Sequence, residues 1–257
     1  MWDPGEYRRF GDERSRPFFD LLAQVDADAP GVVVDLGCGP GTLTATLARR
    51  WPHAQVRGID SSAEMIEAAR ALKHDAGPRL SFALGDVSEW EPDGTVDVIV
   101  SNAVLQWVPD HLAVAARWAG FLPPRGWLAV QIPGNGEQPG DRAVREVAGS
   151  DRWRPLLDGV RLNSQAEDPA QYLDVLAGAG LEADVWETTY LHVLPGDDPV
   201  TGWYRGTGMR PVLAALPPDL TAEFLADYRA RISGAYPPAG YGTIFPFRRV
   251  FAVGVRR

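Results

Sequence analysis

Cysteine is almost absent from this sequence, and long hydrophobic runs are missing altogether. The 257 residues include one cysteine, Cys38, so no intrachain disulfide can form and a reducing compartment is expected. No apolar stretch approaches the ~20 residues that span a bilayer, and residues 1–10 lack the apolar core of a secretion signal. The four histidines and the cysteine show no metal-ligand spacing. These absences predict a soluble, cytoplasmic protein without a bound metal.

Basic residues are outnumbered, since 25 Lys and Arg face 34 Asp and Glu and the formal net charge is -9. A field of that sign repels phosphate backbones and anionic lipid headgroups, so neither nucleic acid nor a membrane surface is an expected partner. Hydrophobic residues make up 45% and charged residues 23%, which is the ordinary range of globular proteins. The length predicts one core domain with an elaboration.

The sequence does contain a series of short apolar strands, most of them ending on a polar residue. Strands are expected at 32–36, 55–60, 80–84, 96–100 and 127–132, with helices at 42–50, after the Ser61 and Glu64 capping pattern, and at about 109–121. The first strand is nearly continuous in apolar residues, as in a strand covered on both faces. This alternation predicts an α/β fold with a doubly wound, mostly parallel sheet, which binds ligands at the carboxyl ends of its strands.

The regular alternation of strands and helices does not continue into the second half of the chain. Residues 134–165 and 195–242 are irregular, apart from a helix through Phe224 and Ile232, and they separate two late strands at 181–191 and 247–255. A helix capped by Asp168 precedes the first of these strands. We therefore expect a core of residues 26–133, 166–194 and 243–257, a helical cap of 134–165 and 195–242, and an N-terminal lid helix within 1–25.

Three glycines, Gly37, Gly39 and Gly41, directly follow the first strand and open the next helix. Glycine permits positive φ and lets a ligand lie against the backbone, and the helix brings its free N–H groups to the same place. Such a loop suits a nicotinamide or flavin dinucleotide, or a smaller adenosine-containing ligand. The motif by itself leaves both classes open.

Two details favour the smaller ligand. The dinucleotide pattern G-x-G-x-x-G needs a glycine where Thr42 stands, and Asp35 puts a negative charge where a pyrophosphate would lie. A cationic ligand without phosphate, such as S-adenosylmethionine, fits better. Asp60 is placed to accept hydrogen bonds from ribose hydroxyls, and Asp86 from the adenine amino group.

Residues 32–41, with Asp60, Asp86 and the segment 102–107, resemble the class I S-adenosylmethionine-dependent methyltransferases over roughly residues 30–132. Segments outside this region, including 186–190 and 207–211, resemble members that esterify a carboxylate of a small tricarboxylic acid. The resemblance implies a Rossmann-like fold, S-adenosylmethionine as cofactor and S-adenosylhomocysteine as product. It also implies a small polycarboxylate as substrate.

The candidate cofactor residues lie in the glycine loop, at the following strand ends and on the N-terminal helix: Asp35, Gly37, Cys38, Gly39, Asp60, Ser61, Met65, Asp86, Val87, Asn102 and Arg16. A polycarboxylate entering a protein of net charge -9 needs a local basic pocket, for which the guanidinium fork is suited. The candidate substrate residues are aromatic or basic: Tyr7, Trp107, Arg145, His192, Trp203, Tyr204, Arg205, Arg210 and Arg248.

A carboxylate acceptor needs no general base, because a carboxyl group with a pKa near ~4 is ionised at neutral pH. The sequence accordingly shows no Ser-His-Asp or Cys-His arrangement. Three alternatives stay open: a methyltransferase for an unrelated small molecule, a non-catalytic S-adenosylmethionine-binding protein, and a nicotinamide-dependent dehydrogenase.

Overall fold

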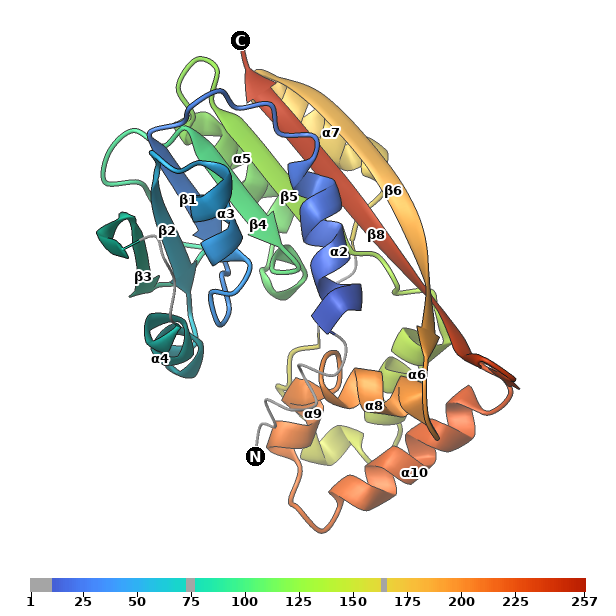
Figure 1. Cartoon of the computed structure of the whole chain (residues 1–257). Helices are drawn as coiled ribbons and strands as arrows, with labels where there is room; N and C mark the ends of the chain where they lie inside the picture. The colour runs from blue at the N-terminus through green and yellow to red at the C-terminus, as the bar shows by residue number, and fades with distance from the viewer. Residues whose placement is uncertain (1–10, 73–76, 163–165) are drawn as a thin grey trace. The chain divides into compact units, whose positions relative to one another are not determined.

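The computed structural model describes residues 11–72, 77–162 and 166–257, and it contains a twisted, mostly parallel sheet (Figure 1). The strands lie in the order β3-β2-β1-β4-β5-β8-β6, and β7 pairs with β8. Their bounds are β1 Val32–Leu36, β2 Gln55–Asp60, β3 Leu80–Leu84, β4 Val98–Asn102, β5 Trp127–Pro133, β6 Leu181–Leu194, β7 Pro238–Ala239 and β8 Gly242–Arg256. The first five strands of this order are parallel, and β8 is antiparallel to β5. The predicted fold class is confirmed.

Helices cover both faces of the sheet. The helices α5 His111–Phe121 and α7 Pro169–Gly178 lie on one face, and α2 Gly11–Leu22 and α3 Thr44–Arg50 lie on the other (Figure 1). Trp118 and Tyr172 pack with strand residues such as Ile99 in the core between α5, α7 and the sheet. Coverage on both faces explains why the central strands are almost uniformly apolar.

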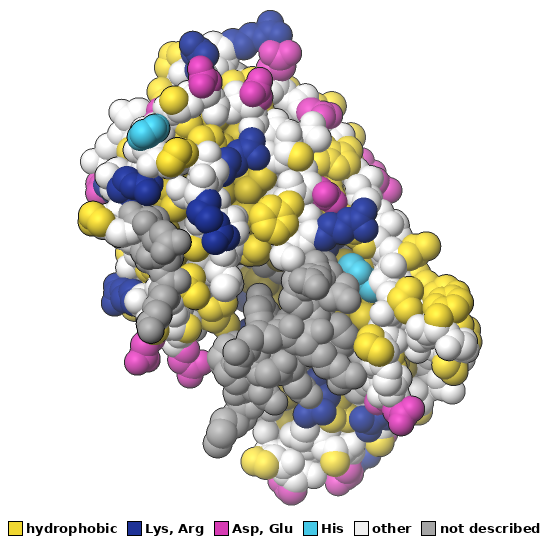
Figure 2. Space-filling model, viewed as in Figure 1, with side chains coloured by type: hydrophobic (Ala, Val, Ile, Leu, Met, Phe, Trp, Pro, Cys, Tyr) yellow, Lys and Arg dark blue, Asp and Glu magenta, His cyan; other side chains and the backbone are white. Residues whose placement is uncertain are grey.

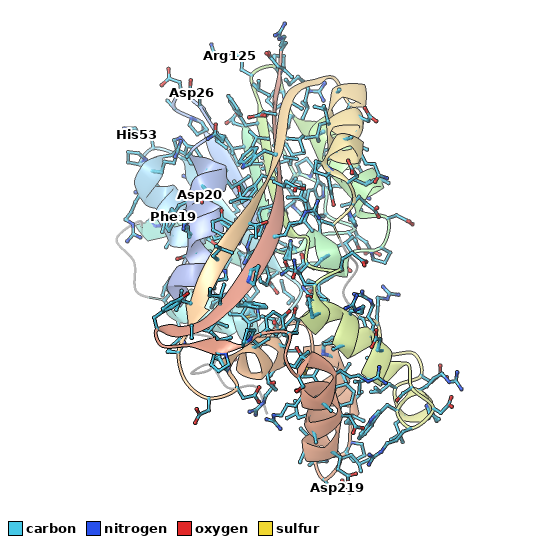
Figure 3. All side chains as sticks on the ribbon, turned by 90° about the vertical axis from the view of Figure 1, so that its right-hand side faces the viewer. Phe19, Asp20, Asp26, His53, Arg125 and Asp219 are labelled. Carbon is cyan, nitrogen blue, oxygen red and sulfur yellow. The ribbon has the colours of Figure 1, made fainter. Side chains whose placement is uncertain are left out.

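The N-terminal helix predicted within residues 1–25 is described from Gly11 onward, and residues 1–10 lie outside the described residues. Phe18, Leu21 and Leu22 are buried, which is the apolar stripe of the prediction. The neighbouring Phe19 is 48% exposed and is labelled with Asp20 in Figure 3. The helix is thus amphipathic, as its sequence indicates.

The N-terminal caps of two helices were predicted from local sequence patterns. Asp168 caps α7 with a complete capping box, in which its side chain accepts from Ala170 N and its own N–H donates to Gln171. This prediction is confirmed. The cap of α4 Ala63–Ala71 is Ser62, whose hydroxyl accepts from Met65 N, so the predicted Ser61–Glu64 box is wrong by one residue. The N–H of Ser62 donates a hydrogen bond to the side chain of Asp60, and this contact fixes the position at which the helix starts.

The chain divides into two compact units. The sheet unit comprises Ser15–Pro133, Ala166–Thr188 and Arg249–Arg257. The helical unit includes Gly134–Gln165 and Thr189–Arg248, with α6 Pro139–Ala148, α8 Pro199–Arg205, α9 Arg210–Ala215 and α10 Thr221–Ile232. The neighbouring strands β6 and β8 continue from one unit into the other (Figure 3).

The helical unit has a core of its own that is rich in aromatic side chains, among them Trp153, Trp203, Phe224 and Phe245. Of its four longer helices only α10 was predicted, because Gly, Pro and charged residues interrupt the apolar spacing of α6, α8 and α9. The described residues also include three single-turn helices, namely η1 Gly77–Arg79, η2 Leu105–Trp107 and η3 Arg154–Leu156. Apolar, basic and acidic side chains are interspersed on the face drawn in Figure 2.

Candidate active site

The loop that follows β1 is fixed to the neighbouring strand by its backbone. The N–H groups of Gly37 and Cys38 both donate to the carbonyl of Ile59, at 2.7 and 3.0 Å. Gly37 has a φ of +83°, and a Cβ there would lie 2.0 Å from Val104, so its glycine is required by packing. Gly39 has a φ of +54°, and a Cβ there would meet nothing within 4 Å. The backbone at Gly39 therefore borders open space that a ligand can enter.

This loop lies at the point where the strand order reverses. The chain leaves β1 for β2 and β3 on one side, and β4 and β5 lie on the other. Ligands of open α/β sheets bind in the crevice outside the carboxyl ends of the strands at such a switch point. Asp35 near the end of β1, Asp60 at the end of β2 and Asn102 at the end of β4 are brought to this edge, as the sequence predicts.

Asp35 is 3% exposed and accepts a hydrogen bond from Thr44 Oγ1 at 2.6 Å. Burial raises the pKa of Asp35 to about 7. The Thr44 hydrogen bond lowers this pKa, and the negative charge of Asp60 raises it by less than that. A buried carboxyl group in this state gains most from a nearby cation, because a positive charge offsets the lost hydration of the carboxylate. The environment thus favours a cationic ligand beside the loop.

Asp60 and Asp86 each hold a turn in place. The two oxygens of Asp60 accept from Gly39 N and Ser62 N, both at 2.9 Å. Asp86 is exposed and accepts from the N–H and the hydroxyl of Ser88, which lower the pKa of its carboxyl group. Each carboxylate oxygen has a second lone pair, so these contacts are compatible with further hydrogen bonds to a ligand.

The other candidate cofactor residues differ in exposure. Cys38 is buried, and burial followed by the charges of Asp35 and Asp60 raises the pKa of its thiol far above the ordinary value, which makes it a poor nucleophile. Asn102 is half-buried, and its Oδ1 is buried without a hydrogen-bond partner in the described part of the chain. The remaining members are the exposed Ser61, the half-buried Met65, the buried Val87 and the exposed Arg16, which lies 3.6 Å from Asp20.

The aromatic candidates for the substrate site have different surroundings. Tyr7 lies outside the described residues. Trp107 belongs to the sheet unit and is 40% exposed. His192 is buried and stacks on Trp203 at 5.2 Å, and the hydroxyl of Tyr204 donates to Asp141. These last three side chains are part of the core of the helical unit or its lining, so packing accounts for their positions.

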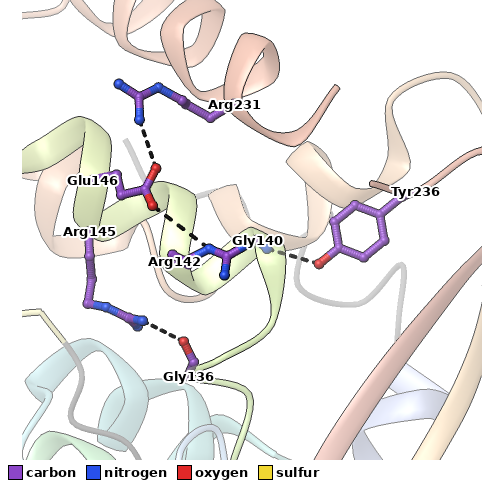
Figure 4. A network of polar contacts seen from close by, with 7 residues as sticks. All are labelled: Gly136, Gly140, Arg142, Arg145, Glu146, Arg231 and Tyr236. Carbon is purple, nitrogen blue, oxygen red and sulfur yellow. Dashed lines mark hydrogen bonds and ion pairs between the residues drawn. The ribbon is translucent and has the colours of Figure 1, made fainter. Parts of the chain in front are cut away.

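The four arginine candidates all belong to the helical unit. Arg145 donates to the carbonyl of Gly136 at 2.5 Å, in a network where Glu146 also pairs with Arg142 and Arg231 (Figure 4). Arg248 donates from Nη1 to the carbonyl of Gly134 at 3.3 Å. Arg205 and Arg210 are exposed. Arg145 and Arg248 thus help to order the segment after β5.

Two buried polar side chains of the sheet unit were not predicted as site residues. Gln131 on β5 is 1% exposed and Arg249 on β8 is 3% exposed, and Arg249 Nη1 donates to Gln131 Oε1 at 3.0 Å. Each is a polar residue within an otherwise apolar strand sequence, and this feature could have identified them as candidate site residues. Within the described ranges, the side chains form no group of three His, Cys, Asp or Glu that could hold a metal ion, and none of the helices is long and apolar enough to cross a membrane.

Comparison with known proteins agrees with this geometry. Residues 33–126, which include the glycine loop and β4, match the methyltransferase domain family, so fold and loop together define a methyltransferase. A trans-aconitate 2-methyltransferase of Streptomyces coelicolor is 51% identical over 260 residues, covering 98% of this chain and 86% of the relative. That of Streptomyces avermitilis is 49% identical over 260 residues, covering 98% and 96%. The chain belongs to the trans-aconitate 2-methyltransferase family.

Solved structures support the fold. The YcgJ protein of Bacillus subtilis has a TM-score of 0.60 at 17% identity, covering 94% of this chain and 98% of that protein. Phosphoethanolamine N-methyltransferase 2 of Haemonchus contortus, solved in complex with S-adenosyl-L-methionine, has a TM-score of 0.57 at 16% identity, covering 94% and 52%. At such identities the likeness concerns the arrangement of the backbone alone.

Proposed function

We propose that the protein transfers the methyl group of S-adenosylmethionine to a carboxylate of trans-aconitate or a similar small polycarboxylic acid, forming a methyl ester. The observation that carries this proposal is the identity of 49–51% with trans-aconitate 2-methyltransferases over 98% of the chain. The glycine loop at the switch point and the buried acid beside it supply the matching chemistry. The single cysteine favours a cytoplasmic location for this enzyme.

The residues at the carboxyl edge fit this cofactor better than a dinucleotide. Open space over Gly39 admits a ligand to the backbone, and Asp35, with its pKa of about 7, favours a cationic amino group or sulfonium over a pyrophosphate. The residues that would hold the cofactor are Asp35, Gly37, Cys38, Gly39, Asp60, Ser61, Met65, Asp86, Val87, Asn102 and Arg16. When bound, it supplies an electrophilic methyl group on a positively charged sulfur.

The chain's own task is then to bind and orient the acceptor. A carboxylate is already ionised at neutral pH, so no side chain has to remove a proton from it. Holding it in line with the methyl group and excluding water can contribute roughly 7–11 kcal/mol to lowering the barrier. The high pKa of the buried Cys38 thiol speaks against a covalent relay through this residue.

Substrate selection is assigned to the basic and aromatic side chains. In this proposal Arg205 and Arg210, which are exposed, bind carboxylates of the acceptor, and Arg145 and Arg248 order the adjoining segment. Tyr7, Trp107, His192, Trp203 and Tyr204 complete the candidate set. Residues 134–165 and 195–242 would act as the substrate-selecting cap, and the N-terminal helix as a lid.

Release of S-adenosylhomocysteine with trans-aconitate, cis-aconitate, isocitrate and citrate, measured side by side, tests the proposal. We expect release with trans-aconitate to exceed the rate without acceptor clearly, and mass spectrometry to find a monomethyl ester. Equal, negligible release with all four acids would refute the substrate assignment. Calorimetry tests the cofactor assignment separately. Binding of S-adenosylhomocysteine without binding of NADH would support that assignment even if the substrate assignment were refuted.

A further inference from the structure

Three polar side chains form a row across the carboxyl edge of the sheet unit. Asn102 on β4 is paired in register with Gln131 on β5, and Gln131 with Phe251 on β8. Side chains two residues apart on a strand point to the same face, so Arg249 shares the face of Phe251. The hydrogen bond from Arg249 Nη1 to Gln131 Oε1, at 3.0 Å, joins the last two members of the row.

The row lies beside the glycine loop. Asp35 pairs with Val100, so Asn102 lies two residues further toward the carboxyl edge, on the same face as Asp35. Ile99, Val130 and Val250 point to the opposite face, where they belong to the core that contains α5 and α7. With strands about 4.8 Å apart, Arg249 lies roughly 10 Å from β4, which is within the reach of a six-carbon acid.

The polarity of the row changes along its length. Arginine has only donors, so the Arg249 contact identifies Oε1 as the Gln131 atom facing it and leaves Nε2 as a donor. Gln131 Nε2 is buried with no hydrogen-bond partner among residues 11–72, 77–162 and 166–257, and so is the acceptor Asn102 Oδ1. The β4 end therefore offers an acceptor, and the β8 end offers a donor beside a guanidinium.

This order suits a cation and an anion lying side by side. An unpaired buried acceptor takes a donor such as an ammonium group, whereas an amide N–H next to a guanidinium is a binding arrangement for a carboxylate. Both side chains are almost fully buried, at 1% and 3% exposure for Gln131 and Arg249, and low solvent access strengthens charge-assisted hydrogen bonds.

We propose that Gln131 and Arg249 bind a carboxylate of the acceptor that is not methylated, and so determine which carboxylate faces the methyl donor. The proposal rests on the proposed function and places a carboxylate site within the sheet unit. A carboxylate held by a guanidinium has its lone pairs engaged and is a weak nucleophile. The anchored group is therefore the one that stays free of the methyl ester.

The test compares Arg249→Lys and Gln131→Leu with Arg257→Met, an exposed arginine just beyond β8 that pairs with Glu182. We expect Arg249→Lys to raise KM for trans-aconitate by about 10- to 100-fold, and Gln131→Leu by about 3- to 10-fold. The dissociation constant for S-adenosylhomocysteine should stay within about twofold in every variant. Arg257→Met should match the wild type throughout.

Two dicarboxylates, itaconate and glutaconate, locate the anchored carboxyl group because each lacks a different carboxyl of the aconitate skeleton. The wild type should prefer trans-aconitate to the dicarboxylate that lacks the anchored carboxyl group. The ratio of kcat/KM for these two acids should fall toward unity in Arg249→Lys. A KM within twofold of wild type in both folded variants would overturn the inference. The inference would also be overturned if the variants lost affinity for S-adenosylhomocysteine by the same factor as for trans-aconitate. If Arg249→Lys does not fold, Gln131→Leu decides between these outcomes.

Calorimetric titration of trans-aconitate into the complex with S-adenosylhomocysteine separates this inference from the proposed function. Binding to the wild type but not to Arg249→Lys, without turnover, would support the carboxylate site and refute the methyl transfer. Turnover with unchanged KM in both variants would support the methyl transfer and refute the carboxylate site. Neither binding nor turnover in the wild type would refute both.

Discussion

Asp35 combines three properties that make it the most informative single residue of the site: it is buried, it precedes the glycine loop and it lies near a second acid. In an unfolded chain its pKa is the ordinary 3.8, and in the folded protein burial raises the pKa to about 7. The ionised form is therefore penalised only in the folded state. Its contribution to stability is complete below pH 3.8 and is lost as the pH rises toward 7.

Asp35→Asn removes this titration while preserving the shape of the side chain. We expect the free energy of unfolding of the variant, relative to the wild type, to increase by on the order of 2 kcal/mol between pH 5 and pH 8. Urea denaturation at the two pH values measures the difference. Parallel pH dependences for the two proteins would show that the Asp35 carboxyl group titrates normally.

Gly39→Ala tests the open space over the loop. The new Cβ meets nothing within 4 Å but requires a φ of +54°, so we expect a loss of about 1 kcal/mol in stability. Because the Cβ enters the space of the ligand, affinity for S-adenosylhomocysteine should fall more than about tenfold. Gly77→Ala is the matched control, with a φ of +59° and equally open surroundings, and it should lose stability but not affinity. Equal affinity in both variants would contradict a ligand at Gly39.

At the residue scale, the sequence predicted the side chains that follow from strand ends. Asp35, Asp60 and Asn102 stand at the ends of apolar runs, so parallel pairing alone brings them to one edge. The partners of Gln131 and Arg249 depend on how β8 pairs with β5, and that register joins residues 118 positions apart. Nothing in a local pattern determines such a pairing.

At the element scale, the start of α7 is the clearest case of local determination. The sequence predicts a helix capped by Asp168 with Pro169 at its first position. The structure has this cap, which Gln171 completes as a capping box. Asp168→Ala removes the acceptor of the Ala170 N–H, and we expect it to lower the free energy of unfolding by about 1 kcal/mol. Asp174→Ala, at an exposed position of the same helix, should change it by less than about 0.5 kcal/mol. Similar values for the two variants would contradict the capping role, and affinity for S-adenosylhomocysteine should stay unchanged in both.

The helices α6, α8 and α9 illustrate the opposite case. They are short or flanked by Gly and Pro, and helices of this length are marginal by themselves. Their stability comes from packing of side chains such as Val144, Val147, Trp203 and Val212 into the core of the helical unit. The strands of the sheet were easier to predict because short apolar runs, most of them with polar ends, recur along the first half of the chain.

At the scale of the whole molecule, the two units share continuous strands. The chain passes from the sheet unit to the helical unit within β6, after Thr188, and back within β8, after Arg248. Because both units contain parts of the same two strands, unfolding of one unit leaves the ends of these strands unsupported in the other. We therefore expect a single cooperative unfolding transition.

Asp141 makes this expectation testable from the helical unit. Burial raises the pKa of its carboxyl group to about 6, and Tyr204 donates a hydrogen bond to it. Asp141→Asn and Asp35→Asn should shift the same transition, seen identically by far-ultraviolet circular dichroism and by tryptophan fluorescence. As with Asp35, the raised pKa means that the wild type loses stability as the pH rises through 6. Two resolved transitions, each moved by only one substitution, would show that the units unfold independently.

The sequence by itself determined the sheet, the glycine loop and the acids at its edge, because these follow from residue spacing within one strand-loop-helix repeat. Only the tertiary structure decided which basic and aromatic side chains are buried and what they contact. Arg248 and Arg249 are neighbours in sequence, yet one contacts the carbonyl of Gly134 and the other Gln131. Adjacent strand residues point to opposite faces, and the identity of each face is set by the strands that pair beside it.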